Sequence, residues 1–170
     1  YTPARTSNSQ IANLPLNLGG TFSVPSALSV NAPLDVVIIA LGVNDFQAAN
    51  GRDAEATAAA LGRLIAAVRN EEWRSFPLGT GEAPQVLVLA PSGFDAAKGG
   101  PFAEMYAGAP DKLKRLPALL KAEADRAGAE FLDLSAVVPV AHGADGLHYT
   151  PEDHERVAKA VAQKLRTMRR

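Results

Sequence analysis

The chain has 170 residues, of which 47% are hydrophobic and 21% are charged, and its formal net charge is -1 at pH 7. This length suits one domain with a substantial core, so we expect a single domain over residues 1–170. The near-zero charge gives no electrostatic reason to expect a nucleic-acid partner. The chain has no cysteine, which excludes disulfides, thiol nucleophiles and cysteine-ligated metals. No apolar run approaches the roughly 20 residues of a membrane span, and the cellular compartment stays open.

The first buried strand is expected just after a polar N-terminal stretch. Residues 1–33 are rich in Ser, Asn, Pro and Gly, and only a short helix over 25–30 is expected there. Residues 36–42 carry no polar side chain, which predicts a strand buried on both faces of a parallel sheet. The run stops at Gly42-Val43-Asn44-Asp45. An amide and a carboxylate therefore follow the strand, where open α/β sheets bind ligands.

Helices and strands alternate along the rest of the chain. This alternation predicts an α/β fold, a doubly wound parallel sheet with helices on both faces. Pro117 should kink or divide the helix that contains it. The expected elements are a helix over 54–70 capped by Asp53, a strand over 85–90, a long irregular loop over 93–110 as a candidate substrate wall, a helix over 111–127, a strand over 130–134 and a helix from 151 capped by Thr150.

A carboxylate and an imidazole lie close together in the loop before the last helix, at Asp145 and His148. This spacing lets the carboxylate accept from one ring nitrogen and leaves the other as a general base. Asn44, at the strand end, suits an oxyanion donor. Each motif alone is more often a turn or a local hydrogen bond, and the two together on an α/β chain favour catalysis. We expect His142 and His154 to be solvated, because the three histidines lack helical metal-site spacing.

The paired motifs, G-x-N-D at 42–45 and D-G-x-H at 145–148, resemble those of the SGNH hydrolases, also called GDSL-type esterases. Residues 33–45 and the segment Ala4-Arg5-Thr6-Ser7 are similar to the arylesterase/acyltransferase branch. The resemblance covers essentially the whole chain. It implies a three-layer α/β/α, flavodoxin-like fold with a parallel sheet. It also implies a serine ester hydrolase, a carboxylesterase or arylesterase with acyl transfer as a further activity, that needs no metal and no organic cofactor.

The same resemblance assigns roles to seven residues of this sequence. His148 would be the general base and Asp145 its orienting partner. The others would be Asn44 as the side-chain oxyanion donor, Gly42 shaping its turn, Asp45 holding its loop, and Arg5 and Thr6 bordering the substrate pocket.

The chain departs from the family pattern at the nucleophile. It contains no Gly-Asp-Ser, the motif that carries the family's catalytic serine, and no glycine precedes Gly19. We therefore expect the first βα unit and second strand, at least ~30 residues, to be missing from this chain. A companion N-terminal segment would supply the serine, and this chain alone would be inactive. Ser92 and Ser7 lack the strand-to-helix elbow that exposes a nucleophile.

The expected partners are a small ester with a short acyl chain and the companion segment, with a homo-oligomer left open; neither nucleic acid nor a membrane span is expected. Two alternatives stand beside the esterase. One is a pseudoenzyme or binding module of the same fold that keeps the pocket without turnover. The other is a phosphate- or nucleotide-binding domain with Asp45 as an acidic site, although no strand here is followed by a Gly-rich phosphate loop.

Overall fold

The computed structural model of the chain describes residues 20–70 and 83–168. Within these ranges a parallel sheet has the strand order β1-β2-β3, which confirms the predicted parallel pairing. No helix in the described part of the chain is long and apolar enough to cross a membrane. The strands are β1 (Val36–Ile39), β2 (Gln85–Ala90) and β3 (Glu130–Asp133).

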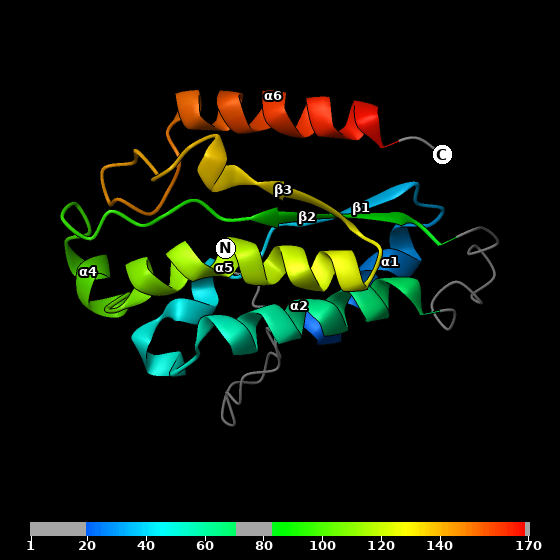
Figure 1. Ribbon diagram of the computed structural model, residues 1–170, viewed down its shortest axis with the longest axis horizontal. Helices are drawn as coiled ribbons and strands as arrows, with labels where there is room; N and C mark the ends of the chain where they lie inside the picture. Colours follow the sequence, from blue (N-terminus) through cyan, green and yellow to red (C-terminus); the bar gives the residue numbers. More distant parts are fainter. Residues whose placement is uncertain (1–19, 71–82, 169–170) are drawn as a thin grey trace.

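Helices cover both faces of the sheet, so the three-layer α/β/α architecture expected from the sequence is confirmed. In Figure 1, α6 lies on one face, and α1, α2 and α5 lie on the other. The short α4 and the segment that precedes α6 lie at the same end of the molecule (Figure 1). The helices are α1 (Gly20–Asn31), α2 (Ala54–Arg69), α4 (Pro101–Met105), α5 (Ala109–Arg126) and α6 (Pro151–Thr167), with 3-10 turns η1 (Val43–Phe46), η2 (Ala48–Asn50) and η3 (Leu134–Ala136).

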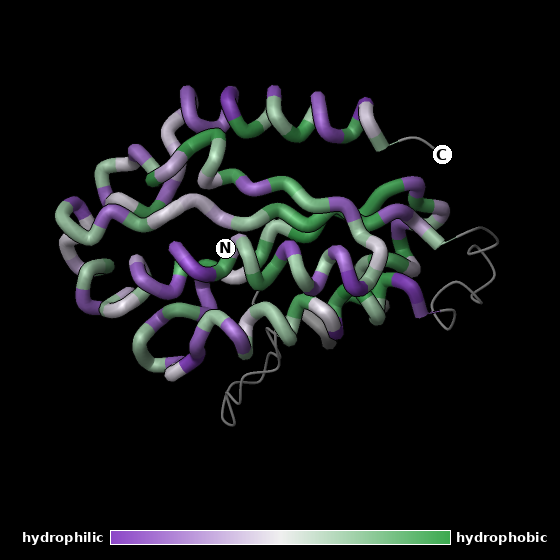
Figure 2. The backbone as a smooth tube through the Cα atoms, in the orientation of Figure 1, coloured by the Kyte–Doolittle hydropathy of each residue, from purple (hydrophilic) through white to green (hydrophobic). Residues whose placement is uncertain are grey.

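The main core lies between the sheet and the layer of α2 and α5. Leu64 of α2 and Leu116 of α5 are fully buried against strand residues such as Val88. Burial of each such side chain contributes about 1.5–3 kcal/mol. The core beneath α6 is smaller, and Val157 and Val161 are only partly buried there. Figure 2 shows the apolar residues of α6 on its sheet-facing side and polar ones outside.

β1 differs from its prediction as a strand buried on both faces. It lies at the edge of the described sheet, with β2 as its described neighbour. Successive side chains point to opposite faces of a strand. Ile39 faces the main core and is 6% exposed, whereas Ile38 faces the other side and is 42% exposed. The apolar run correctly indicates a strand, but it does not say how many neighbours cover it.

Two further boundaries differ from those expected. α1 begins at Gly20, earlier than the expected 25–30, and the predicted loop over 93–110 contains α4 and the start of α5. Pro117 lies inside α5, which runs undivided for 18 residues. Proline removes one backbone hydrogen bond. The buried Leu116 and Leu120 on either side of it hold the helix in the core and outweigh that loss.

Candidate active site

The turn that carries Asn44 leaves β1 at the carboxyl edge of the sheet. Gly42 precedes η1 with φ 124° and ψ -32°, a backbone conformation that residues with a Cβ rarely adopt. A Cβ at this position would lie 3.4 Å from side-chain atoms of both Leu116 and Thr57. That separation is ordinary van der Waals contact, so the positive φ of the turn, and not lack of space, is what favours glycine at position 42.

The Asn44 side chain is oriented by a buried tyrosine from the segment after α4. Tyr106 is 2% exposed, and its hydroxyl donates to Oδ1 of Asn44 over 2.7 Å. Nε2 of Gln47 donates to the same hydroxyl at 3.2 Å. Since Oδ1 accepts from Tyr106, the Nδ2 amide group of Asn44 is the end that is left to donate. This is the orientation that an oxyanion donor requires.

Asp45 points inward from the same turn. It is 1% exposed, and its Oδ2 lies 3.8 Å from Nε of Arg52, which is also largely buried. The backbone N–H of Asp45 donates to the carbonyl of Gly42 at 3.1 Å. The ion pair between Asp45 and Arg52 joins η1 to the segment that leads into α2. Such a contact is expected of a residue that holds the Asn44 loop in place. The burial of Asp45 removes the basis for the alternative in which it forms an accessible acidic site.

Asp145 and His148 form a closely bonded pair in the loop before α6. Nδ1 of His148 lies 2.5 Å from Oδ2 of Asp145, and Oδ1 accepts from the backbone N–H groups of His148 and Leu147 at 2.9 and 3.0 Å. The backbone bond from His148, and next its ring, lower the pKa of Asp145 to about 2. The carboxylate therefore stays ionised, Nδ1 carries the ring proton, and Nε2 is the basic nitrogen. The His148 side chain is 70% exposed.

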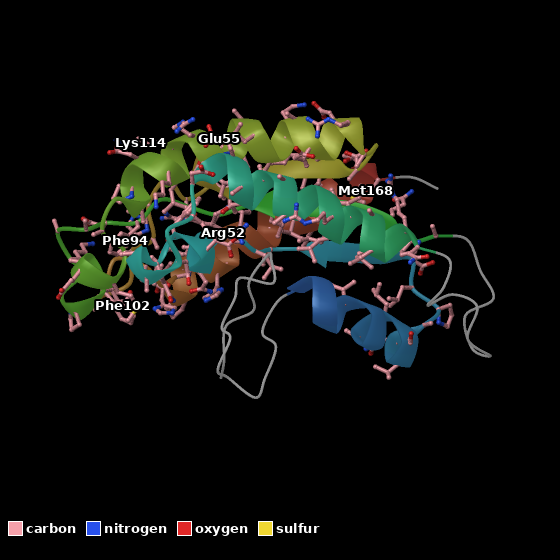
Figure 3. All side chains as sticks on the ribbon, turned by 90° about the horizontal axis from the view of Figure 1, so that it is seen from below. Arg52, Glu55, Phe94, Phe102, Lys114 and Met168 are labelled. Carbon is pink, nitrogen blue, oxygen red and sulfur yellow. The ribbon has the colours of Figure 1, made fainter. Side chains whose placement is uncertain are left out.

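Aromatic contacts connect the two motifs across 100 residues of sequence. The Phe102 ring meets the His148 ring edge-on at 6.1 Å between centroids and lies 6.3 Å from the Tyr106 ring. Tyr106 in turn bonds to Asn44. Figure 3 shows Phe94 and Phe102 at one end of the molecule and Met168 towards the other. The structure thus places the predicted base and the predicted oxyanion donor at one edge of the sheet, with the 93–110 segment beside them.

Comparisons with known proteins identify the family of the chain. The sequence profile of the GDSL-like Lipase/Acylhydrolase family matches residues 4–156. The chain belongs to this family. The resemblance noted from the paired motifs is confirmed, and the family places the chain among esterase-type hydrolases. A search of curated protein sequences returned no match.

Solved structures of other GDSL-like proteins share the fold. Est24, a carbohydrate acetylesterase from Sinorhizobium meliloti, is 32% identical with a TM-score of 0.84, over 98% of this chain and 75% of that one. The native aryl esterase of M. smegmatis is 26% identical with a TM-score of 0.87, over the same shares of the two chains. A putative arylesterase from Agrobacterium tumefaciens is 26% identical with a TM-score of 0.80, over 98% and 76%.

Neither alternative serine of this GDSL-like chain lies at a described nucleophile elbow. Ser92 follows β2 and is 5% exposed, and its Oγ lies 2.6 Å from the Tyr149 hydroxyl. It lines a cavity of about 180 Å³ together with Val43 and Leu147, the neighbours of Asn44 and His148. Ser7 lies outside the described residues, as do Arg5 and Thr6.

Sequence reasoning missed two contacts around this GDSL-like site. His142 is exposed to solvent, as predicted, but its Nδ1 also lies 2.6 Å from Oδ1 of the buried Asp153, a contact that was not foreseen. The bond from Tyr106 to Asn44 was also not foreseen. A buried tyrosine hydroxyl needs a polar partner, so Tyr106 in a segment over a strand end was a usable signal. Among the described residues no group of three or more acidic or histidine side chains could hold a metal ion.

The pKa shift of Asp145 predicts a specific loss of stability in acid. Its folded-state pKa of about 2 lies below the ordinary 3.8, so its bonds stabilise the fold fully above about pH 4. That contribution is lost as the pH falls through the interval between these two values. We expect Asp145→Asn to lower the Tm at pH 6 and to differ little from the parent near pH 2. Thermal melts followed by circular dichroism test this; an equal Tm gap at both pH values contradicts it.

Proposed function

We propose that this protein is a serine ester hydrolase that acts on short-acyl esters, with His148 as general base, Asp145 as its orienting partner and Asn44 as oxyanion donor. The observation that carries the proposal is the meeting of the bonded Asp145–His148 pair and the Tyr106-oriented amide at one edge of the sheet. Gly42 and Asp45 support it by shaping and anchoring the turn. In this proposal Arg5 and Thr6 border the substrate.

The mechanism follows from the protonation states of these groups. Nε2 of His148 takes the proton of the serine as its oxygen attacks the ester carbonyl, and the resulting imidazolium is stabilised by the ionised Asp145. Negative charge develops on the carbonyl oxygen. Nδ2 of Asn44 donates to that oxygen, and because Tyr106 fixes the amide beforehand, little reorganisation is needed. The C–O bond to the alcohol then breaks as the His148 imidazolium gives its proton to the leaving oxygen, and an acyl-serine remains. Nε2 of His148 next takes a proton from water, or from an acceptor alcohol in a transferase reaction, as its oxygen attacks the acyl-serine. The same proton returns to the serine oxygen as the acyl group is released.

In this proposal the nucleophile comes from an N-terminal companion segment. The 170 residues contain no Gly-Asp-Ser, and the solved GDSL-like structures are matched over about three quarters of their length. In the described residues, β1 has a free edge beside the exposed Ile38, which a further parallel strand would cover. Ser92 is disfavoured as the nucleophile because its hydroxyl is buried against Tyr149. The chain alone would then be inactive.

The substrate class rests on two named relatives. Est24 is named a carbohydrate acetylesterase and the M. smegmatis protein an aryl esterase, so both act on esters. We extend this to short-acyl esters for the present chain. A pseudoenzyme that binds such ligands without turnover is the second candidate, and the absence of Gly-Asp-Ser from the sequence is the observation that favours it.

A fluorophosphonate serine probe, read by intact mass spectrometry of the denatured sample, separates these possibilities. We expect a second polypeptide with a Gly-Asp-Ser motif to take the probe and the 170-residue chain to remain unlabelled. A label on Ser92 of this chain would contradict the companion segment. A single unlabelled species without turnover of p-nitrophenyl acetate would contradict the esterase and favour the pseudoenzyme.

A further inference from the structure

A second histidine–carboxylate pair lies next to the proposed catalytic pair. The Asp153 carboxylate, in the first turn of α6, is 1% exposed. Its Oδ1 lies 2.6 Å from Nδ1 of His142, and its Oδ2 accepts from the backbone N–H of His142 at 3.0 Å and of Thr150 at 3.2 Å. One buried carboxylate therefore contacts both ends of the segment 142–150, and the catalytic pair lies between them.

Further bonds inside this segment leave it little freedom. The backbone N–H of Gly143 donates to the carbonyl of His148 at 2.9 Å, and a Cβ at position 143 would lie only 2.3 Å from that oxygen. The carbonyl of Gly146 accepts from the N–H of Asp95 at 2.9 Å, which ties the middle of the segment to the chain that follows β2. Displacement of His142 or Thr150 would thus be transmitted to His148 through Gly143.

Helix capping alone does not account for the hydrogen bonds of the buried Asp153 carboxylate. Thr150 caps α6 through its own hydroxyl, which accepts from the N–H of Asp153 at 3.2 Å. The two bonds to His142 lie outside the helix and serve only the loop. Burial raises the pKa of Asp153, but the bonds from His142, and then from Thr150, lower it to about 2. A buried carboxylate that stays charged is costly unless its partners stay in place, so the loop is held where those partners are.

We propose that Asp153 and His142 are a positioning pair that fixes the loop carrying Asp145 and His148, so that Nδ1 of His148 stays protonated towards Asp145 and Nε2 stays basic. The catalytic consequence rests on the proposed function. Misplacement of a catalytic group by about 1 Å can cost about 100-fold in rate. The placement itself is measurable without any turnover, so the two proposals can fail separately.

The test reads the histidine tautomers by NMR, in the purified protein with any companion segment that accompanies it. The chain has only three histidines, so long-range ¹⁵N–¹H spectra of ¹⁵N-histidine-labelled protein resolve each ring. We expect His148 in the parent to show one tautomer, protonated at Nδ1. In Asp153→Asn we expect His148 to shift to a tautomer mixture. If the preparation has esterase activity, kcat should fall by about 10- to 100-fold with KM little changed.

Two matched variants separate positioning from charge and from helix capping. Glu152→Gln makes the same charge change one residue away at an exposed site, and Thr150→Ala removes the cap hydroxyl while keeping the backbone bond to Asp153. Both should keep the parent His148 tautomer, although Thr150→Ala lowers the Tm. An unchanged His148 in folded Asp153→Asn overturns the proposal. If Asp153→Asn does not fold, the same measurement is made on His142→Ala. We expect a partial shift of the His148 tautomer in that variant. An unchanged His148 tautomer there would overturn the proposal.

Discussion

His148→Ala is expected to lower kcat/KM for p-nitrophenyl acetate by about 10³- to 10⁴-fold in the intact esterase. In the proposed mechanism the substitution removes the ring nitrogen that takes the serine proton, and it leaves Asp145 without its ring partner. The oxyanion donor and the substrate pocket stay, so a small residual rate over water is expected. Because the His148 side chain is 70% exposed, its removal creates no core cavity, and the loss measures chemistry more than folding.

His154→Ala is the matched control for that experiment. His154 is exposed six residues further along, and its ring meets Tyr149 edge-on at 5.5 Å between centroids. We expect its removal to change kcat/KM by less than about threefold, as for an ordinary surface site. Imidazole added to the buffer should restore part of the His148→Ala activity and have no such effect on the control. Full turnover in His148→Ala, with a normal melting curve, would show that another group is the base.

Much of the fold was predictable because its signals are local. β2 was predicted at 85–90 and is found there, from a short apolar run between loop residues. α2 begins after Asp53, whose carboxylate accepts from the N–H of Ala56 at 2.7 Å, as expected of an N-cap. α6 also begins where it was predicted, at Pro151, because Thr150 caps it and the proline suits its first turn. Such contacts span three or four residues, and the sequence displays them directly.

The errors of prediction concern contacts that the sequence does not display. The edge position of β1 depends on which strands are its neighbours, which no residue of β1 encodes. The segment 93–110 was predicted as a long irregular loop. There Gly99 packs against Phe94 and Ala103, and Pro101 opens α4, so these residues begin a helix instead of preventing one.

The candidate site shows the same contrast between local contacts, which were predicted, and long-range contacts, which were not. The bond between Asp145 and His148 spans three residues and was foreseen from their spacing. The bond from Tyr106 to Asn44 spans 62 residues, and the bond from His142 to Asp153 joins a loop to a helix. Both depend on packing that brings distant segments together. The groups proposed to do chemistry were therefore readable from sequence, whereas the groups that hold them in place were not.

Asn44→Ala is expected to lower kcat by about 10²- to 10³-fold while KM changes little. In the proposed mechanism the Nδ2 group donates to charge that exists only in the transition state, so its loss should spare substrate binding. The substitution also leaves the Tyr106 hydroxyl without its acceptor, in a site that is 2% exposed. Part of the effect could then be structural, and a Tm measurement on the same sample separates that part.

Tyr106→Phe separates the orientation of the amide from its presence. The variant keeps the buried ring and its packing on Phe94 and Phe102, but it no longer donates to Oδ1 of Asn44. The amide can then rotate and present its oxygen to the developing oxyanion for part of the time, so kcat should fall by about 10-fold, the effect of one lost hydrogen bond of about 1 kcal/mol or slightly more. In Asn44→Ala the tyrosine has no amide to orient, so adding Tyr106→Phe should lower kcat no further. A double mutant in which the two losses multiply would mean that Tyr106 acts on the reaction by a route other than Asn44.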